Sequence, residues 1–216
     1  MEFINQTIHL FHQGGPIMYV MVVCSFFAVA IAVERVLYFK SVTQNLPEFK
    51  QQIKPLVEKG RFSDATQLCE KNAPNILAGI ALAGLQAFQQ GSKLENALES
   101  ASSLAAANLR ERLDDLSMLV TLSPLLGLLG TVIGMIQSFS ILQVQSGQPM
   151  AITGGVGEAL IATATGLSIA TLALLLHNIF SRKVNRLITE IEQTAALIIN
   201  HVSTQKIGRR DAHEIA

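Results

Sequence analysis

The sequence predicts an all-α integral membrane protein with three transmembrane helices, the second and third of which continue as long helices into water. Half of its 216 residues are hydrophobic and only 15% are charged, whereas about a quarter are charged in soluble domains. Between Ser117 and Ser181 the one formally charged side chain is Glu158, and residues 3–33 carry none. Both stretches exceed the roughly 20 apolar residues that cross a bilayer as a helix.

The first predicted span covers residues 16–39. Pro16 suits a first helical turn, where its missing N–H would have no partner, and the run Ile17–Val33 carries no charge. Upstream, residues 1–15 gather their larger apolar side chains on one helical face, which indicates a short amphipathic helix on the membrane surface.

A polar stretch, residues 40–116, is expected to form a helical domain. Proline and glycine disfavour helix interiors, and Ser63 is suited to cap a helix. No breaker lies between Leu94 and Leu116, so we expect one uninterrupted helix to run from this domain into the second span. The expected interruptions are at Pro47, Pro55, the Asn72–Asn75 run and Gly91-Ser92.

The second and third spans are predicted at residues 117–144 and 156–180, joined by an uncharged loop at residues 145–155. The third is expected to continue as a helix into the tail, residues 181–216. Apolar residues between Val184 and Val202 keep a helical period there. Because no other part of the chain is assigned to cover this stripe, we expect it to pack between subunits of a homo-oligomer.

The basic residues predict the orientation in the membrane. Ten Lys and Arg lie within Arg35–Arg112 and six within Arg182–Arg210, while the N-terminal segment and the loop at residues 145–155 have none. Basic residues favour the cytoplasmic side. We therefore expect a periplasmic N-terminus and periplasmic loop, a cytoplasmic helical domain at residues 40–116 and a cytoplasmic C-terminus.

Glu158 is the side chain best suited to carry chemistry. A carboxylate within a span is costly, and such groups usually face a cavity or a partner. The alternative is that Glu158, near the outer end of its span, reaches the membrane interface. Its short stem and the lack of a nearby Lys or Arg in the sequence argue against that alternative.

Hydroxyl residues surround Glu158 in the sequence. At 100° per residue Thr165 lies almost beneath Glu158 on one helix, and Thr163 is offset by about 140°. The second span adds Thr131. Hydroxyls in apolar helices often bond carbonyls of their own preceding turn, which would give these residues a structural role only. The alternative is that the hydroxyls form a row of polar groups beside the carboxylate.

The second span also contains small and helix-bending residues. Gly127, Gly130 and Gly134 suit close helix packing, the last two as a Gly-x-x-x-Gly pair. Pro124 frees a carbonyl near Val120 and is expected to bend the helix, either as a hinge or for packing.

Other function classes are disfavoured. Cys24 and Cys69 are expected to stay reduced as packing residues, and His9 with His12 provides too few ligands for a metal site. No phosphate loop, nucleophile motif or redox pair occurs, and Arg209-Arg210 is too small a patch for nucleic acid. We expect no enzyme activity, cofactor or metal.

Two motifs on consecutive spans resemble a known family. Ser-Pro-Leu-Leu-Gly-Leu-Leu-Gly-Thr-Val-Ile-Gly-Met (Ser123–Met135) is similar to the second-span motif of the MotA/TolQ/ExbB proton channel family. Glu-Ala-Leu-Ile-Ala-Thr-Ala-Thr-Gly (Glu158–Gly166) resembles the third-span motif of its ExbB/TolQ branch. The resemblance covers residues 120–185 in sequence and nearly the whole chain in topology.

The resemblance implies a pentamer in a bacterial inner membrane, surrounded by lipid. Two copies of a single-span ExbD- or TolR-like partner would thread its pore, and a TonB- or TolA-like protein would receive the work. It places Glu158, Thr131 and Thr163 in the proton pathway, with Thr165 where relatives commonly have Ile. Protons would be the coupling ion, since five carboxylates near one axis cannot all stay ionised.

Three alternatives stay open at this point. The chain could serve a TolQ-like system of the Tol-Pal type, or act as a non-conducting scaffold in which Glu158 pairs with a basic partner residue. An enzyme using Glu158 as an acid or base is disfavoured because no second catalytic group is present. The flagellar stator branch usually has four spans, and three are predicted here.

Overall fold

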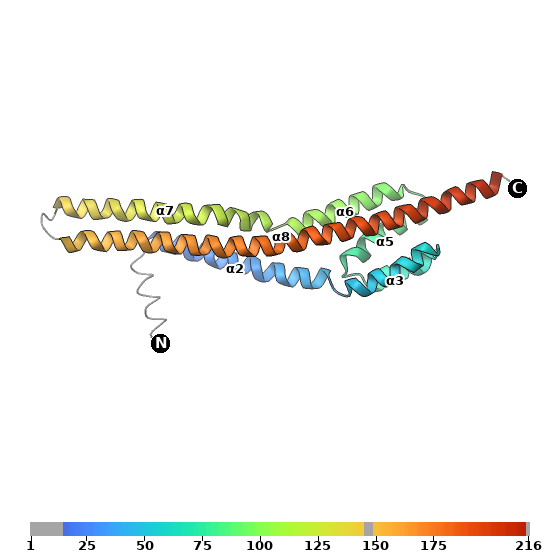
Figure 1. Ribbon diagram of the computed structural model, residues 1–216, viewed down its shortest axis with the longest axis horizontal. Helices are drawn as coiled ribbons and strands as arrows, with labels where there is room; N and C mark the ends of the chain where they lie inside the picture. The colour runs from blue at the N-terminus through green and yellow to red at the C-terminus, as the bar shows by residue number, and fades with distance from the viewer. Residues whose placement is uncertain (1–14, 145–148, 215–216) are drawn as a thin grey trace. The chain divides into compact units, whose positions relative to one another are not determined.

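The computed structural model describes the backbone of residues 15–144 and 149–214, and the side chains of residues 15–140 and 154–202. Residues 1–14 of the expected amphipathic helix and residues 145–148 of the expected loop therefore fall outside the described residues. The rest of the expected loop, residues 149–155, is helical and forms the start of the last helix, so the third helical stretch begins earlier than residue 156. Every element in the described part is an α-helix, which confirms the predicted class (Figure 1). The order is α2 (Ile17–Val42), α3 (Leu46–Glu58), α4 (Phe62–Lys71), α5 (Ile76–Gln89), α6 (Leu94–Arg110), α7 (Leu113–Val144) and α8 (Pro149–Glu214).

The chain divides into two compact units. The membrane unit comprises Met1–Glu34 and Arg112–Phe180, and the polar unit comprises Arg35–Glu111 and Ser181–Ala216. Helices α2 and α8 contribute residues to both units. Among the described residues, three helical stretches are long and apolar enough to cross a membrane, and they include α2, most of α7 and most of α8.

In the membrane unit, all three helices meet in two buried clusters. Met18 and Met21 of α2 pack with Ala162 and Ile169 of α8, with Leu126 of α7 against them. A second cluster joins Cys24 and Ala28 of α2 to Leu119 of α7 and Ala173 of α8. These contacts hold the start of α2 against both other helices.

The outer surface of the membrane unit is apolar. Phe26 on α2, Leu125 on α7 and Leu160 on α8 are 75%, 62% and 65% exposed. Water would disfavour so much contiguous apolar surface, whereas lipid does not. The three predicted spans are thus found as helices whose exposed side chains suit a bilayer.

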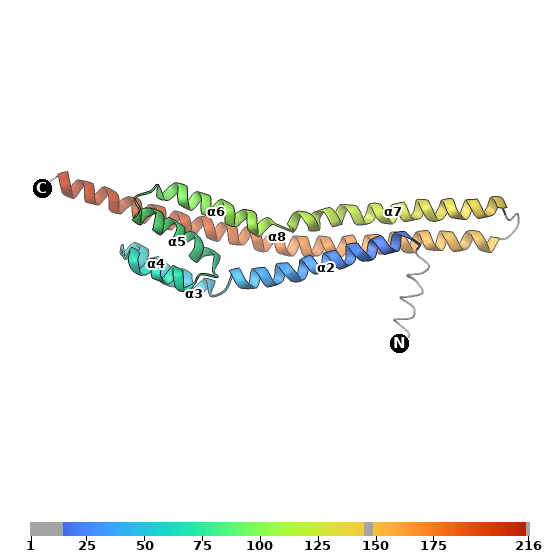
Figure 2. The same cartoon turned by 180° about the vertical axis from the view of Figure 1, so that it is seen from behind.

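In the polar unit, α3 packs on α4, α4 on α5 and α5 on α6. Figure 2 shows these helices beside the C-terminal part of α8. The apolar stripe of α8 is buried within this unit: Val184, Leu187, Ile191, Ile198 and Val202 are each at most 4% exposed. The expectation that other subunits cover this stripe is therefore wrong, because the chain's own polar stretch covers it.

Two predicted helix boundaries in the polar unit are also wrong. The interruption expected at Pro47 is confirmed, because α2 ends at Val42 and Pro47 lies in the first turn of α3. The interruption expected at Pro55 is absent, since Pro55 lies in the interior of α3. The apolar side chains of this helix, including Phe49 and Ile53, are buried, and this burial offsets the hydrogen bond that Pro55 cannot donate. Helix α4 begins at Phe62, so Ser63 lies inside the helix instead of capping it.

The uninterrupted helix expected from Leu94 to Leu116 is instead two helices. Helix α6 ends at Arg110 and α7 begins at Leu113. Arg112 has φ 67°, in the left-handed region, and Glu111 is extended. A left-handed residue cannot continue a right-handed helix, so α6 and α7 are separate helices.

Buried charge in the polar unit is paired. Arg35 is 2% exposed; its guanidinium donates to the Asn108 carbonyl at 3.1 Å and lies 3.9 Å from the Glu111 carboxylate. The Asn108 carbonyl is in the last turn of α6, where carbonyls lack intrahelical donors. Lys50 pairs with Glu190 of α8 at 3.4 Å, which ties α3 to α8.

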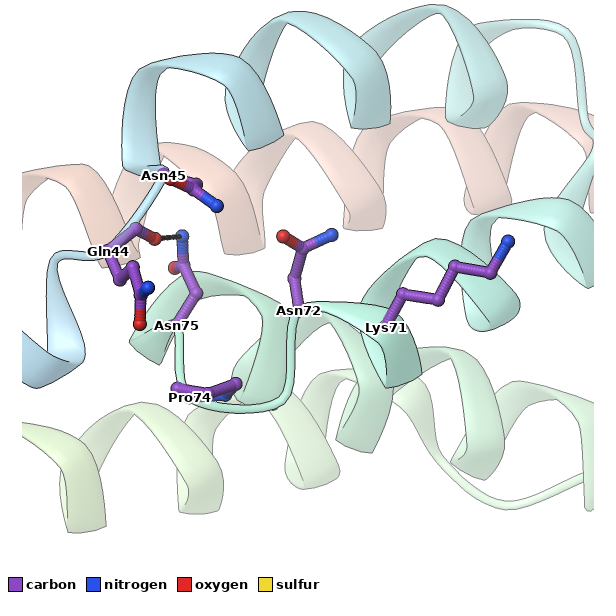
Figure 3. Close-up of a pocket in the computed structure, with 6 residues that line it drawn as sticks. All are labelled: Gln44, Asn45, Lys71, Asn72, Pro74 and Asn75. Carbon is purple, nitrogen blue, oxygen red and sulfur yellow. Dashed lines mark hydrogen bonds between the residues drawn. The ribbon is translucent and has the colours of Figure 1, made fainter.

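The predicted pause at Asn72–Asn75 is confirmed as the connection between α4 and α5. Asn75 caps α5, because its side-chain oxygen accepts from the Leu77 N–H at 2.9 Å. Its amide nitrogen donates to the Gln44 carbonyl at 2.9 Å. Figure 3 shows Gln44 and Asn75 with Asn45, Lys71, Asn72 and Pro74, which together line a small pocket. The volume of this pocket is about 130 Å³. The predicted interruption at Gly91-Ser92 is likewise confirmed between α5 and α6.

Both cysteines are free and buried, as predicted. Burial, with a smaller contribution from the Glu70 charge, raises the pKa of the Cys69 thiol from 9.0 to about 12. Because the folded pKa exceeds the unfolded one, the stability that the neutral thiol contributes is complete below pH 9 and declines as pH rises toward 12.

Cys69 is therefore expected to resist thiol reagents in the folded protein. At pH 8 its thiolate fraction should be about a thousandfold below that of an unfolded cysteine. The measurement is the rate of N-ethylmaleimide labelling of a Cys24→Ala variant, read by mass, with and without denaturant. Equal rates in the two conditions would contradict the buried position of Cys69.

Candidate functional site

Glu158 lies in the N-terminal part of α8, within the membrane unit, and is half-buried. Its carboxylate packs against the backbone of Gly15, two residues before the start of α2 at Ile17. A β-carbon built on Gly15 would overlap the Oε1 atom of Glu158 and lie 2.8 Å from its Cδ. Gly15 has φ 67°, a conformation that glycine adopts readily and most other residues do not.

The threonine hydroxyls near Glu158 are bonded to backbone carbonyls. Thr165 donates to the Ile161 carbonyl of its own helix at 2.8 Å, and Thr131 donates to the Leu128 carbonyl at 2.6 Å. A hydroxyl has one proton to donate, so neither donates to Glu158 in the single subunit. These two follow the intrahelical pattern that is common for hydroxyls in apolar helices.

Thr163 is different, because its hydroxyl crosses between helices. It donates to the Gly127 carbonyl of α7 at 3.2 Å. Helical geometry favoured Thr165 as the neighbour of Glu158, and the family resemblance favoured Thr163. The structure brings Thr163 to α7 and keeps Thr165 on its own helix.

Small residues form the contact between α7 and α8. A β-carbon built on Gly166 would lie 2.6 Å from the Ser123 carbonyl oxygen and 3.1 Å from the Gly127 Cα. A β-carbon on Gly130 would lie 2.6 Å from the Ala162 Cβ. This contact, the glycine seam, comprises Ser123, Gly127, Gly130, Gly134 and Ser138 of α7 with Gly155, Ala159, Ala162, Thr163 and Gly166 of α8.

Helix α7 is continuous through Pro124. The residue before it, Ser123, is fully buried, and its hydroxyl has no hydrogen-bond partner among the described residues. The Ser123 carbonyl is the atom that Gly166 approaches most closely. Pro124 therefore lies next to one of the close contacts between α7 and α8.

Sequence reasoning found part of this arrangement and missed part. It singled out Gly127, Gly130 and Gly134 but not their counterparts Gly155 and Gly166 on α8. The pattern was available, because small residues recur on α8 at intervals of four, three and four: Gly155, Ala159, Ala162 and Gly166. The contact of Gly15 with Glu158 had no comparable signal.

The described residues contain no group of three or more His, Cys, Asp or Glu side chains that could bind a metal. His9 and His12 lie outside the described residues. The candidate site is therefore a lone carboxylate next to a helix contact made of glycines and hydroxyl groups.

The fold and the site together define a helical membrane subunit in which Glu158 is the single formally charged side chain of the second and third spans. Residues 72–193 match the model of the MotA/TolQ/ExbB proton channel family, and this match covers more than half of the chain. The chain belongs to this family, in its ExbB-like branch. The matched residues include Thr131, Glu158 and Thr163.

Relatives with ExbB names occur in distant organisms. An ExbB-like protein 3 of Synechocystis is 33% identical over 77% of this chain and 81% of its own length. A putative ExbB homolog of Methanothermobacter thermautotrophicus is 26% identical over 88% of this chain and 68% of its own length. The biopolymer transport protein exbB1 of Vibrio cholerae is 27% identical over 90% of this chain and 86% of its own length.

Family and structure establish the general role. The chain is a membrane protein and a proton-channel subunit of the type that energises transport. Its family consists of proton channels and not of enzymes. The match to the family model covers α5, α6, α7 and most of α8. Gly15 and the helices α2, α3 and α4 lie outside residues 72–193.

Proposed function

We propose that this chain is the proton-channel subunit of an inner-membrane motor that converts proton motive force into mechanical work at the cell envelope. The observation that supports this proposal most is Glu158, the single formal charge between Ser117 and Ser181, held beside a tightly packed helix pair. A carboxylate in this setting can bind a proton from one side and release it to the other. Each proton delivers about 2.3 kcal/mol per 100 mV.

The residues have distinct roles in this proposal. Glu158 binds and releases the proton. Thr131 and Thr163 line the pathway and position water or the proton, and Thr165 contributes one further hydroxyl. Each of these hydroxyls still has acceptor capacity after donating to a carbonyl.

Subunits assemble as a pentamer around a pore in the proposed motor. Two copies of a single-span ExbD- or TolR-like protein occupy the pore, and an acidic residue of that partner meets the Glu158 ring. A TonB- or TolA-like protein receives the work, with uptake across an outer membrane as the process energised. The ExbB names of the relatives favour the ExbD and TonB type over the Tol-Pal type.

The proposed orientation places the N-terminus in the periplasm and the polar unit in the cytoplasm. The distribution of basic residues supports it: ten within Arg35–Arg112 and six within Arg182–Arg210. The exposed apolar face of the membrane unit then contacts lipid and neighbouring subunits. Nucleic acid, metal and organic cofactors have no part in the mechanism.

The assembly itself is the experiment that tests this proposal. The tagged full-length chain, purified in mild detergent from its own host, is expected to give a native mass equal to five copies plus two copies of a small single-span protein. The co-purified protein should carry an acidic residue in its span. A monomer at every concentration, or a partner with a basic residue facing Glu158, would contradict the motor and favour the scaffold.

A further inference from the structure

The first turn of α2 is fixed in place beside Glu158. The Met18 N–H donates to the Gly15 carbonyl at 3.1 Å, so Gly15 belongs to the start of the helix. Met18 and Met21 are buried against Ala162 and Ile169 of α8. Ile17 also packs near Gly130 of α7, 3.6 Å from a β-carbon built there. This turn cannot withdraw from α8 without exposing that cluster.

The carboxylate occupies the space that a side chain at residue 15 would need. A β-carbon on Gly15 would overlap Oε1 of Glu158, lie 2.8 Å from Cδ and lie 3.5 Å from Cγ. Since the turn is anchored and the Glu158 side chain can rotate, a substitution at residue 15 would displace the carboxylate. The N-terminal end of a helix also favours a nearby negative charge.

We propose that Gly15 is a positioning residue for the proton carrier. Because Gly15 has no side chain, the Glu158 carboxylate can lie against the first turn of α2, on the subunit's own first span. We call this position of the carboxylate, in contact with Gly15, the seat. This inference rests on the proposed role of Glu158. It adds that α2, as well as α8, determines where the proton-carrying carboxylate lies. Gly15 lies outside the part of the chain that matches the family model. The first span thereby acts on the proton site as well as anchoring the subunit.

Chemical labelling of Glu158 tests the seat directly. Dicyclohexylcarbodiimide is an apolar reagent that adds to protonated carboxyl groups, and peptide mass spectrometry reports its addition at Glu158. Gly15→Ala in the assembled complex is expected to raise the labelling rate about tenfold, because the displaced carboxylate loses its cover. A rate within about twofold of the unsubstituted protein would overturn the proposal.

Gly91→Ala is the matched control. Gly91 has φ 73° and a β-carbon there would meet nothing within 4 Å, so this variant carries the strain of a left-handed alanine without a collision. It should label like the unsubstituted protein. If Gly91→Ala raised the Glu158 labelling rate as much as Gly15→Ala does, backbone strain would explain the effect and the seat would be refuted.

A double variant separates displacement of the carboxylate from general damage. Glu158→Asp shortens the side chain by one methylene and should vacate the seat, so Gly15→Ala should have little further effect on labelling or on activity in that background. The same background should restore membrane accumulation if Gly15→Ala alone fails to fold. Effects that combine independently, or accumulation that Glu158→Asp fails to restore, would contradict the contact. An active Glu158→Gln variant would instead refute the proton-carrier role while leaving the labelling result to decide the seat.

Discussion

Glu158→Gln is expected to abolish work driven by proton motive force, by at least about a hundredfold, the scale of positioned proton transfer. Glutamine keeps the volume and most of the hydrogen-bonding capacity of the side chain but cannot titrate. The complex should still assemble with its partner. The measurement is envelope function dependent on proton motive force, made beside co-purification of the small single-span protein.

More conservative substitutions are expected to reduce the same function by smaller amounts. Glu158→Asp keeps the titrating group and should retain partial function. Thr131→Val and Thr163→Val should impair function less than Glu158→Gln, because a hydroxyl positions or relays a proton without storing charge. If Glu158→Gln lost its partner on purification, the lost contact would be an ion pair, and the scaffold alternative would replace the proton carrier.

Gly166→Ala is expected to destabilise the membrane unit by about 1–3 kcal/mol, the usual cost of overpacking. The added methyl group would lie 2.6 Å from the Ser123 carbonyl oxygen and 3.1 Å from the Gly127 Cα. These are backbone atoms, so α7 and α8 must separate to admit it. The measurement is the midpoint of thermal unfolding of the purified protein in detergent, which should fall.

Gly157→Ala is the matched control on the same helix, since a β-carbon at Gly157 meets nothing within 4 Å. Alanine favours a helix over glycine by about 1 kcal/mol. Gly157→Ala should therefore leave the midpoint unchanged or raise it. A midpoint that rises for Gly166→Ala as well would mean that the two helices are not in backbone contact at the glycine seam.

The spans and the carboxylate could be predicted from the sequence because they depend on local composition. A sufficiently long charge-free run satisfies its backbone hydrogen bonds in a bilayer by forming a helix. Glu158 is easily recognised because it is the single formal charge within such a run. The Asn72–Asn75 connection was also predictable, because Asn75 caps α5 with its own side chain. Each of these inferences needs only residues close together in the chain.

The features that sequence reasoning missed depend on tertiary contacts. Glu111 and Arg112 are good helix formers, so no local pattern predicts the left-handed conformation of Arg112 that separates α6 from α7. Pro55 stays inside α3 because burial of that helix outweighs a lost hydrogen bond. The apolar stripe on α8 was assigned to other subunits because no local pattern shows that α3–α6 return to cover it.

Some features of the candidate site could likewise be predicted from local spacing, and others depend on tertiary contacts. The glycines of α7 and the hydroxyls of both spans can be read from spacing, and the small residues of α8 recur with the same period. Which hydroxyl crosses to the neighbouring helix cannot be read from spacing. Thr163, and not Thr165, bonds to α7, because the close approach at Gly127 brings a carbonyl within reach of residue 163.

Proton entry into liposomes tests the role of Glu158 most directly. The purified complex with its single-span partner is reconstituted around a pH-sensitive dye, a potassium gradient with valinomycin sets the membrane potential, and internal acidification is followed. The intact complex should acidify the interior at a rate that increases with the potential, and the Glu158→Gln complex should match empty liposomes. Acidification by the Glu158→Gln complex at the rate of the intact complex would show that protons cross without this carboxylate.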